Sequence, residues 1–184
     1  MSIFNSKFKE IFSAQVVSIF GGLIAGTILV IYTDKILLIP GMLILLPGFL
    51  EMRGNISGTL AARITSGLFL KVIGQDKINT RIIRQNIWAS FLLAIFISFV
   101  LGIVAFAFNY FAMGIFLPKI IWIPIIAGII ANAIEIPLTI FCTFYFFRKG
   151  HDPDNIMGPF VTSAGDVTSV LALLIALVLI WPIL

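Results

Sequence analysis

Long apolar stretches alternate with short polar ones along the whole chain. Four of the apolar stretches hold about 20 or more mostly apolar residues, which is enough for a helix to cross a membrane core about 30 Å thick. We predict membrane-spanning helices over residues of about 11–32, 87–111, 120–147 and 158–181. The polar segments between them predict turns outside the membrane.

A further apolar region, residues 36–71, is too long for one simple crossing. As a single helix it would measure about 54 Å, against about 30 Å for the membrane core. Its signals for a helix break are Pro40-Gly41, Pro47-Gly48 and the polar run 51–55. Non-helical backbone is tolerated at membrane depth only where it is buried in protein or lines a watery cavity. We expect a break near residues 47–55 that lines an ion pathway, with a simple proline kink as the alternative.

Together these elements predict an all-α integral membrane protein with five transmembrane helices, the second long and broken. Composition supports this class, since 60% of the 184 residues are hydrophobic and 11% are charged, unlike a soluble domain. The chain has one cysteine, Cys142, so an internal disulfide framework and a cysteine-rich metal site are excluded.

Basic residues are distributed unevenly between the two sides that five crossings define. The N-terminal side carries eight and the other side carries two, and cytoplasmic segments are the ones enriched in Lys and Arg. The eight are Lys7, Lys9, Lys71, Lys77, Arg81, Arg84, Arg148 and Lys149, and the two are Lys35 and Lys119. We predict a multi-pass protein of the cell membrane with a cytoplasmic N-terminus and an external C-terminus. Because topology accounts for the net charge of +4, no nucleic-acid partner is predicted.

One carboxylate, Asp166, lies inside the last predicted span, with Thr162 and Ser169 on the same side of the helix. An ionisable side chain at that depth is costly and indicates a functional site. By residue count Asp166 lies about 12 Å from the inner boundary and Glu51 about 22 Å from the outer one, so their depths nearly coincide. We predict that both line one cavity, together with the Asn55 amide.

Carboxylate, amide, hydroxyl and carbonyl oxygens are ligands for hard cations such as Mg²⁺ and Ca²⁺. One chain offers few acids for a cation pathway, so we expect a symmetric dimer that brings two copies of Asp166 toward a shared axis. Two close carboxylates repel each other, and a divalent cation between them removes that conflict. Since Mg²⁺ dehydrates reluctantly, few direct ligands favour recognition of a hydrated ion.

A second carboxylate, Glu135, lies near the middle of the fourth predicted span. Asn132 and Thr139 share its face of the helix. Two interpretations stay open. Glu135 belongs to the ion pathway, or it is a hydrogen-bonded carboxyl that holds helices together.

Two segments closely resemble the paired signatures of the MgtE and solute-carrier family 41 magnesium transporters. They are PGFLEMRGNISGTLAARITSG at 47–67 and DPDNIMGPFVTSAGDVTSV at 152–170. The first corresponds to the family's P-x-L-x-G-x-x-GN element, and the second to its DP…P…D element, which ends at Asp166. The resemblance implies a homodimer with a pore at or near its axis, lined by the second and fifth helices.

In this resemblance Asp166 is the central carboxylate that selects Mg²⁺, and Gly54, Asn55 and Thr162 correspond to positions that line the same site. The predicted metal-site residues are Asp166, Thr162, Asn55, Gly54, Glu51, Glu135 and Gly158.

Two features differ from bacterial MgtE proteins, which carry large cytoplasmic acidic and CBS domains. About ten residues precede the first span, so we expect a single transmembrane domain over residues 1–184 without such domains. The run from Glu51 to Arg53 is nearer to the solute-carrier half-repeat than to the glycine-rich bacterial version. Channel-like conduction and exchange or coupled transport therefore both stay open.

We predict a transporter of divalent cations, Mg²⁺ above all and Mn²⁺ or other divalent ions as well, with membrane lipid and a second copy as partners. The alternative is a non-transporting scaffold or subunit in which Asp166 and Glu135 hold helices together. An enzyme is not predicted, because nucleophilic catalysis needs a nucleophile beside a base. The one histidine, His151, lies outside the spans, where we expect it to be only solvated.

Overall fold

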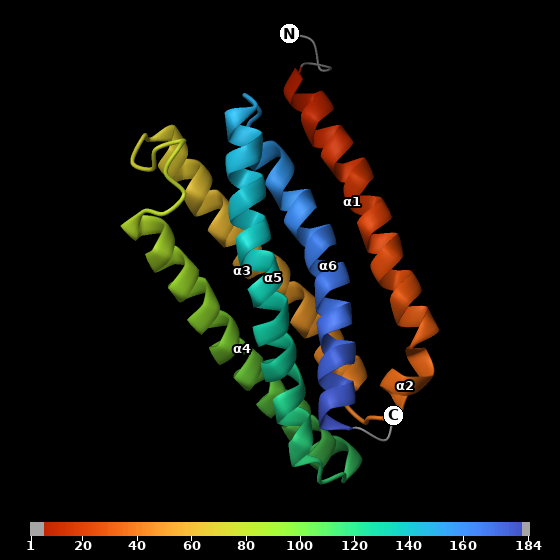
Figure 1. Cartoon of the computed structure of the whole chain (residues 1–184). Coiled ribbons are helices and arrows are strands. Elements are labelled where there is room, and N and C mark those ends of the chain that lie inside the picture. The colour runs from red at the N-terminus through yellow and green to blue at the C-terminus, as the bar shows by residue number, and fades with distance from the viewer. Residues whose placement is uncertain (1–5, 182–184) are drawn as a thin grey trace.

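Helices make up almost all of the part of the chain that the structure describes. The structure is a computed structural model, and it describes residues 6–181. Within that range no strand is present, which confirms the predicted all-α class. The helices are α1 (Ser6–Ile31), α2 (Thr33–Leu37), α3 (Met42–Phe69), α4 (Arg81–Met113), α5 (Trp122–Arg148) and α6 (Pro153–Ile180), with a short 3₁₀ helix, η1 (Pro118–Ile121), before α5. The long helices run up and down between the two ends of a bundle (Figure 1).

Four segments of the described chain are helical, long and apolar enough to cross a membrane. They are Lys7–Ile31, Arg81–Met113, Pro118–Arg148 and Pro153–Ile180. They cover the first, third, fourth and fifth predicted spans, as expected of a multi-pass membrane protein. α3 is 28 residues long and lies among them, but its charged residues Glu51, Arg53 and Arg63 make it more polar than these four segments.

α4 and α6 begin earlier than hydropathy predicts, because polar residues cap them. α4 starts at Arg81, where the Thr80 hydroxyl accepts a hydrogen bond from the Ile83 N–H at 3.3 Å. α6 starts at Pro153, where the Asp152 carboxylate accepts from the Asp154 N–H at 3.1 Å. Such caps satisfy backbone N–H groups that have no partner inside the helix. The polar lead-in to the last span is therefore the first turn of α6.

The second apolar region is broken at the first of its three predicted signals, Pro40-Gly41, and not at the other two. A break near residues 47–55 is wrong, because α3 runs without interruption from Met42 to Phe69 and includes Pro47. Pro47 removes only one backbone N–H, and a continuous helix keeps the other backbone groups satisfied where water is scarce. The chain instead turns at residues 38–41, between α2 and α3, where Gly41 has a φ of +84°.

Replacing Gly41 by alanine should lower the free energy of unfolding by more than left-handed backbone strain alone, which costs about 1 to 2 kcal/mol. A Cβ there would lie 2.5 Å from Asn109 Oδ1, whose amide donates to the Pro40 carbonyl at 2.8 Å. Gly114 is the matched control, since its φ is +68° and a Cβ would meet nothing within 4 Å. Thermal unfolding in detergent should show Gly41→Ala less stable than Gly114→Ala, and equal losses would contradict this account.

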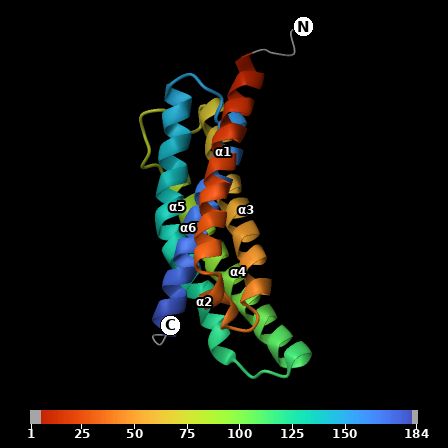
Figure 2. The ribbon, with the colours of Figure 1, turned by 90° about the vertical axis from the view of Figure 1, so that its right-hand side faces the viewer.

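α6 lies at the centre of the fold and carries Asp166. It packs against α1, α3 and α5, whereas α4 packs against α3 and α5. Figures 1 and 2 show α1 at the edge of the bundle, alongside α6. The contact is close, since a Cβ on Gly21 of α1 would lie 2.6 Å from the Cβ of Ser163. This packing leaves another side of α6 to α3 and α5, the helices that carry the candidate residues outside α6.

Candidate divalent-cation site

A cavity of about 440 Å³ lies between α3 and α6. Its walls carry two carboxylates, an amide and a hydroxyl. The lining residues are Pro47, Leu50, Glu51, Gly54 and Asn55 of α3 and Thr162 and Asp166 of α6. The structure thus brings five of the seven predicted metal-site residues around one cavity, and Glu51 and Asp166 share it as their depths indicate.

The α3 wall is one face of the helix, because Glu51, Gly54 and Asn55 follow at intervals of three and four residues. The Asn55 side-chain amide donates to Glu51 Oε1 at 3.1 Å, one turn away. This bond orients the Glu51 carboxylate, while the amide oxygen of Asn55 stays available as an acceptor. Because α3 is continuous through Glu51, Gly54 and Asn55, the oxygens that these residues offer a cation are those of side chains and not of an unwound backbone.

The α6 wall carries Thr162 and Asp166 one turn apart. The Thr162 hydroxyl donates its proton to the Gly158 carbonyl at 2.9 Å. Its oxygen lone pairs are therefore free to face a cation or a water bound to one. Gly158, a predicted site residue, lies outside the cavity lining and serves as this acceptor.

Gly54 keeps space open between the two walls. A Cβ built on it would lie 3.9 Å from Thr162 Oγ1, which is an ordinary contact. A side chain longer than alanine would project into the cavity. The glycine therefore sets the free width of the cavity between α3 and Thr162.

The cavity suits a hydrated hard cation. Its two charged lining residues, Glu51 and Asp166, are both acidic, and its polar donors are mostly oxygens. A water occupies about 30 Å³ in the liquid, so about 440 Å³ holds an ion together with a water shell. Over residues 6–181 the structure has no group of three or more His, Cys, Asp and Glu that could hold an ion. The oxygens that face this cavity therefore come from a mixture of carboxylate, amide and hydroxyl groups.

Glu135 lies outside this lining, in a buried cluster shared by α3, α5 and α6. Its carboxylate oxygens lie 2.6 Å from Arg53 Nη2, 2.8 Å from Ser57 Oγ and 2.6 Å from Thr168 Oγ1. The exposed fractions of the Arg53 and Glu135 side chains are 0% and 2%. Of the two interpretations that the sequence leaves open, this geometry matches the one in which the carboxyl holds helices together.

Sequence reasoning assigned no partner to Arg53, which is the main residue it missed. The guanidinium also donates from Nη1 to Asn132 Oδ1. A signal was present, because a charged residue inside a span pairs with an opposite charge or a carbonyl. Glu135 was the acid of the fourth span without an assigned partner, so pairing it with Arg53 was open to inference.

A family model described as MgtE, divalent cation transporter, matches residues 46–176, which is more than half of the chain. The chain belongs to the MgtE family of divalent cation transporters. No curated protein matches it in a sequence search. The matched segment contains every residue of the cavity lining. Membership in MgtE identifies a transporter and not an enzyme, and it favours transport over the scaffold interpretation.

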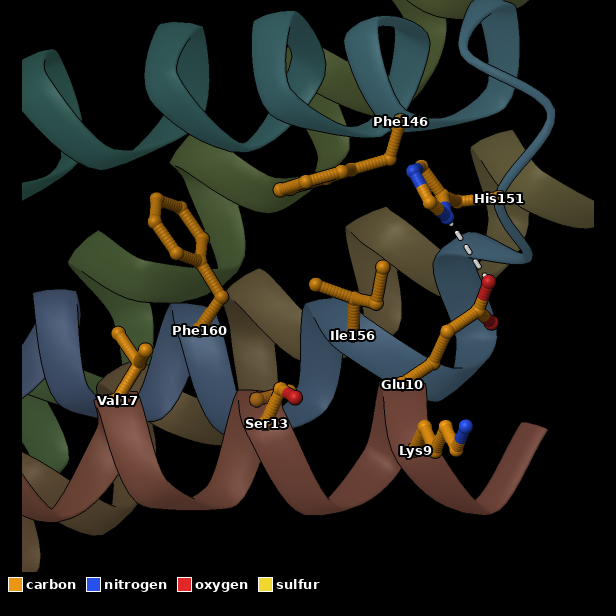
Figure 3. Close-up of a pocket in the computed structure, with 9 residues that line it drawn as sticks. Lys9, Glu10, Ser13, Val17, Phe146, His151, Ile156 and Phe160 are labelled. Atoms are coloured by element: carbon orange, nitrogen blue, oxygen red, sulfur yellow. Dashed lines mark hydrogen bonds and ion pairs between the residues drawn. The ribbon is translucent and has the colours of Figure 1, made fainter. Parts of the chain in front are cut away.

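A second cavity of this MgtE-family protein, about 410 Å³, lies between the start of α1, the end of α5 and the start of α6. Figure 3 shows Val17, Phe146 and Phe160 around it and Glu10 and His151 at one end. His151 Nδ1 lies 2.8 Å from Glu10 Oε1 of α1. The expectation that this histidine is only solvated is therefore wrong. Since the cavity walls are mainly apolar, the α3–α6 cavity is the better cation site.

Proposed function

We propose that this protein transports Mg²⁺ as a hydrated ion through the α3–α6 cavity, with Asp166 as the principal carboxylate. The supporting observation is the cavity itself, where two carboxylates, an amide and a hydroxyl from two helices surround space for an ion and its waters. Mg²⁺ usually keeps several waters and binds through one or two carboxylates. Mn²⁺ and other divalent cations use the same oxygen donors and compete for the site.

A second copy of the chain completes the site in this proposal. Glu51, Asn55 and Thr162 are exposed on the single chain and Asp166 is half-buried, although all four lie away from the helix ends. Polar and charged side chains facing lipid at that depth are costly. A homodimer whose twofold axis passes beside this face covers them and adds a second Asp166. The divalent cation then offsets the repulsion between the two carboxylates.

Five crossings, by α1, α3, α4, α5 and α6, fit the distribution of charge. The start of α1, the α3–α4 connection and the α5–α6 connection lie at one end of the bundle (Figure 1), and the predicted eight basic residues lie in these segments or in the adjoining helix ends. We assign this end to the cytoplasm and the end of α6 to the outside of the cell membrane. Residues 1–184 form one transmembrane domain in this proposal, with lipid around its exposed apolar faces.

Mn²⁺ tests the site directly. We expect crystals soaked in Mn²⁺ to show anomalous density beside Asp166 and Glu51, and an excess of Mg²⁺ to displace it, because both ions use oxygen ligands. Added Mg²⁺ should also raise the melting temperature of the wild-type protein and leave that of Asp166→Asn unchanged. An empty cavity at saturating Mn²⁺, with equal Mg²⁺ stabilisation of both proteins, would contradict the proposal.

A further inference from the structure

The buried pair of Arg53 and Glu135 connects both walls of the cation cavity without lining it. We infer that this pair positions Asp166 against Gly54 and Asn55, and that it keeps the Glu135 charge from disturbing the cation site. The inference rests on the proposed function, since it assigns a role to residues beside the proposed site. Arg53 and Glu135 are positioning residues, which act on the cation through their neighbours.

On the α3 side, Arg53 directly precedes Gly54 and Asn55. Its Nε donates a hydrogen bond to Glu135 Oε1 at 3.3 Å, and its Nη2 lies 2.6 Å from Oε2 as an ion pair without hydrogen-bond geometry. A charge-assisted hydrogen bond together with an ion-pair contact is more restrictive than either alone. It fixes the rotation of α3 about its own axis, with Arg53 turned toward α5. The following residues are thereby turned toward the cavity.

On the α6 side, the same carboxylate contacts the chain on either side of Asp166. The Thr168 hydroxyl lies 2.6 Å from Glu135 Oε1, its nearest acceptor, and 2.9 and 3.1 Å from the carbonyl oxygens of Ala164 and Gly165. A Cβ on Gly165 would lie 3.7 Å from Glu135 Oε2, so the carboxylate lies against the α6 backbone one residue before Asp166. Glu135 therefore links the Asp166 segment of α6 to Arg53, and through it to the opposite wall.

The pair also balances charge next to the site. An unpaired charge buried in a protein is strongly unfavourable, and a second free carboxylate would repel that of Asp166. Pairing with Arg53 offsets the Glu135 charge and so weakens its repulsion of the Asp166 carboxylate. Removing the Glu135 charge alone would leave the Arg53 cation unopposed beside the site, where it repels a divalent cation.

A concentration series of Mg²⁺ uptake into proteoliposomes separates positioning from simple structural support. Glu135→Gln should raise the KM for Mg²⁺ by roughly 10-fold, because it leaves a buried positive charge near the ion. The double variant Arg53→Met with Glu135→Gln removes both charges and should recover at least half of that loss on a logarithmic scale. A purely structural role predicts instead a lower maximal rate, in proportion to folded protein, at an unchanged KM.

A milder variant keeps the test decisive if Glu135→Gln does not fold. Thr168→Val removes only the α6 hydroxyl that donates to Glu135 and should raise KM by roughly threefold. The matched control is Thr143→Val, since Thr143 is buried and its hydroxyl donates to its own helix, at the Thr139 carbonyl. An unchanged KM in Thr168→Val and Glu135→Gln would overturn the inference. If Asp166→Asn also transports normally, the proposed function itself fails.

Discussion

Replacing Asp166 by asparagine should lower saturable Mg²⁺ uptake by at least about 100-fold, while the protein still folds and forms the proposed dimer. Asparagine has nearly the same shape as aspartate but no charge, and a full charge near a divalent ion is worth several kcal/mol at partly buried sites. In the fold Asp166 lines a cavity and is only half-buried, so the substitution leaves core packing intact. Proteoliposome flux with a fluorescent Mg²⁺ indicator measures the effect.

Asp76→Asn is the matched control for that experiment, because Asp76 is an exposed acid in the α3–α4 connection. Its uptake should stay within about twofold of the wild type, since an exposed charge away from the site is screened by water and salt. Thermal unfolding separates the competing interpretation. If Asp166 only held helices together, Asp166→Asn would lower the melting temperature and leave uptake per folded protein unchanged, and that result would contradict the assigned role.

Replacing Gly54 by leucine should block uptake, by at least about 20-fold, without unfolding the protein. The leucine side chain would project from α3 into the cavity, where it displaces the water that a hydrated ion needs. Gly54→Ala should be tolerated to within about threefold, because its Cβ would make only an ordinary contact of 3.9 Å with Thr162 Oγ1. The graded series, measured by the same flux assay, tests whether the cavity is the route of the ion.

The control for the leucine substitution is Gly22→Leu on α1, where a Cβ would meet nothing within 4 Å. It adds the same side chain at an exposed position of a helix that does not line the cavity, so uptake should be unchanged. Equal losses in Gly22→Leu and Gly54→Leu would indicate a general effect on insertion or folding. Full uptake in Gly54→Leu would place the ion route elsewhere.

Much of the architecture follows from the sequence alone. An apolar, charge-poor chain with long uninterrupted stretches has few options other than membrane-spanning helices, because backbone groups in lipid must be satisfied within the segment. The rarity of charge in these stretches makes Asp166 and Glu51 conspicuous, and counting residues along each helix places them at similar depth. Helix ends were less predictable, since the capping residues Thr80 and Asp152 extend α4 and α6 beyond their apolar cores.

The tertiary structure decided those features that do not follow from the position of a residue along the chain. Counting residues gives depth along a helix axis, but the rotation of each helix about that axis depends on side-chain packing with its neighbours. That rotation turns Arg53 toward Glu135 while Gly54 faces the cavity. The place of the break was settled in the same way, because Asn109 of α4 packs against Gly41 and bonds the Pro40 carbonyl. Such contacts join residues far apart in sequence, and only the folded bundle brings them together.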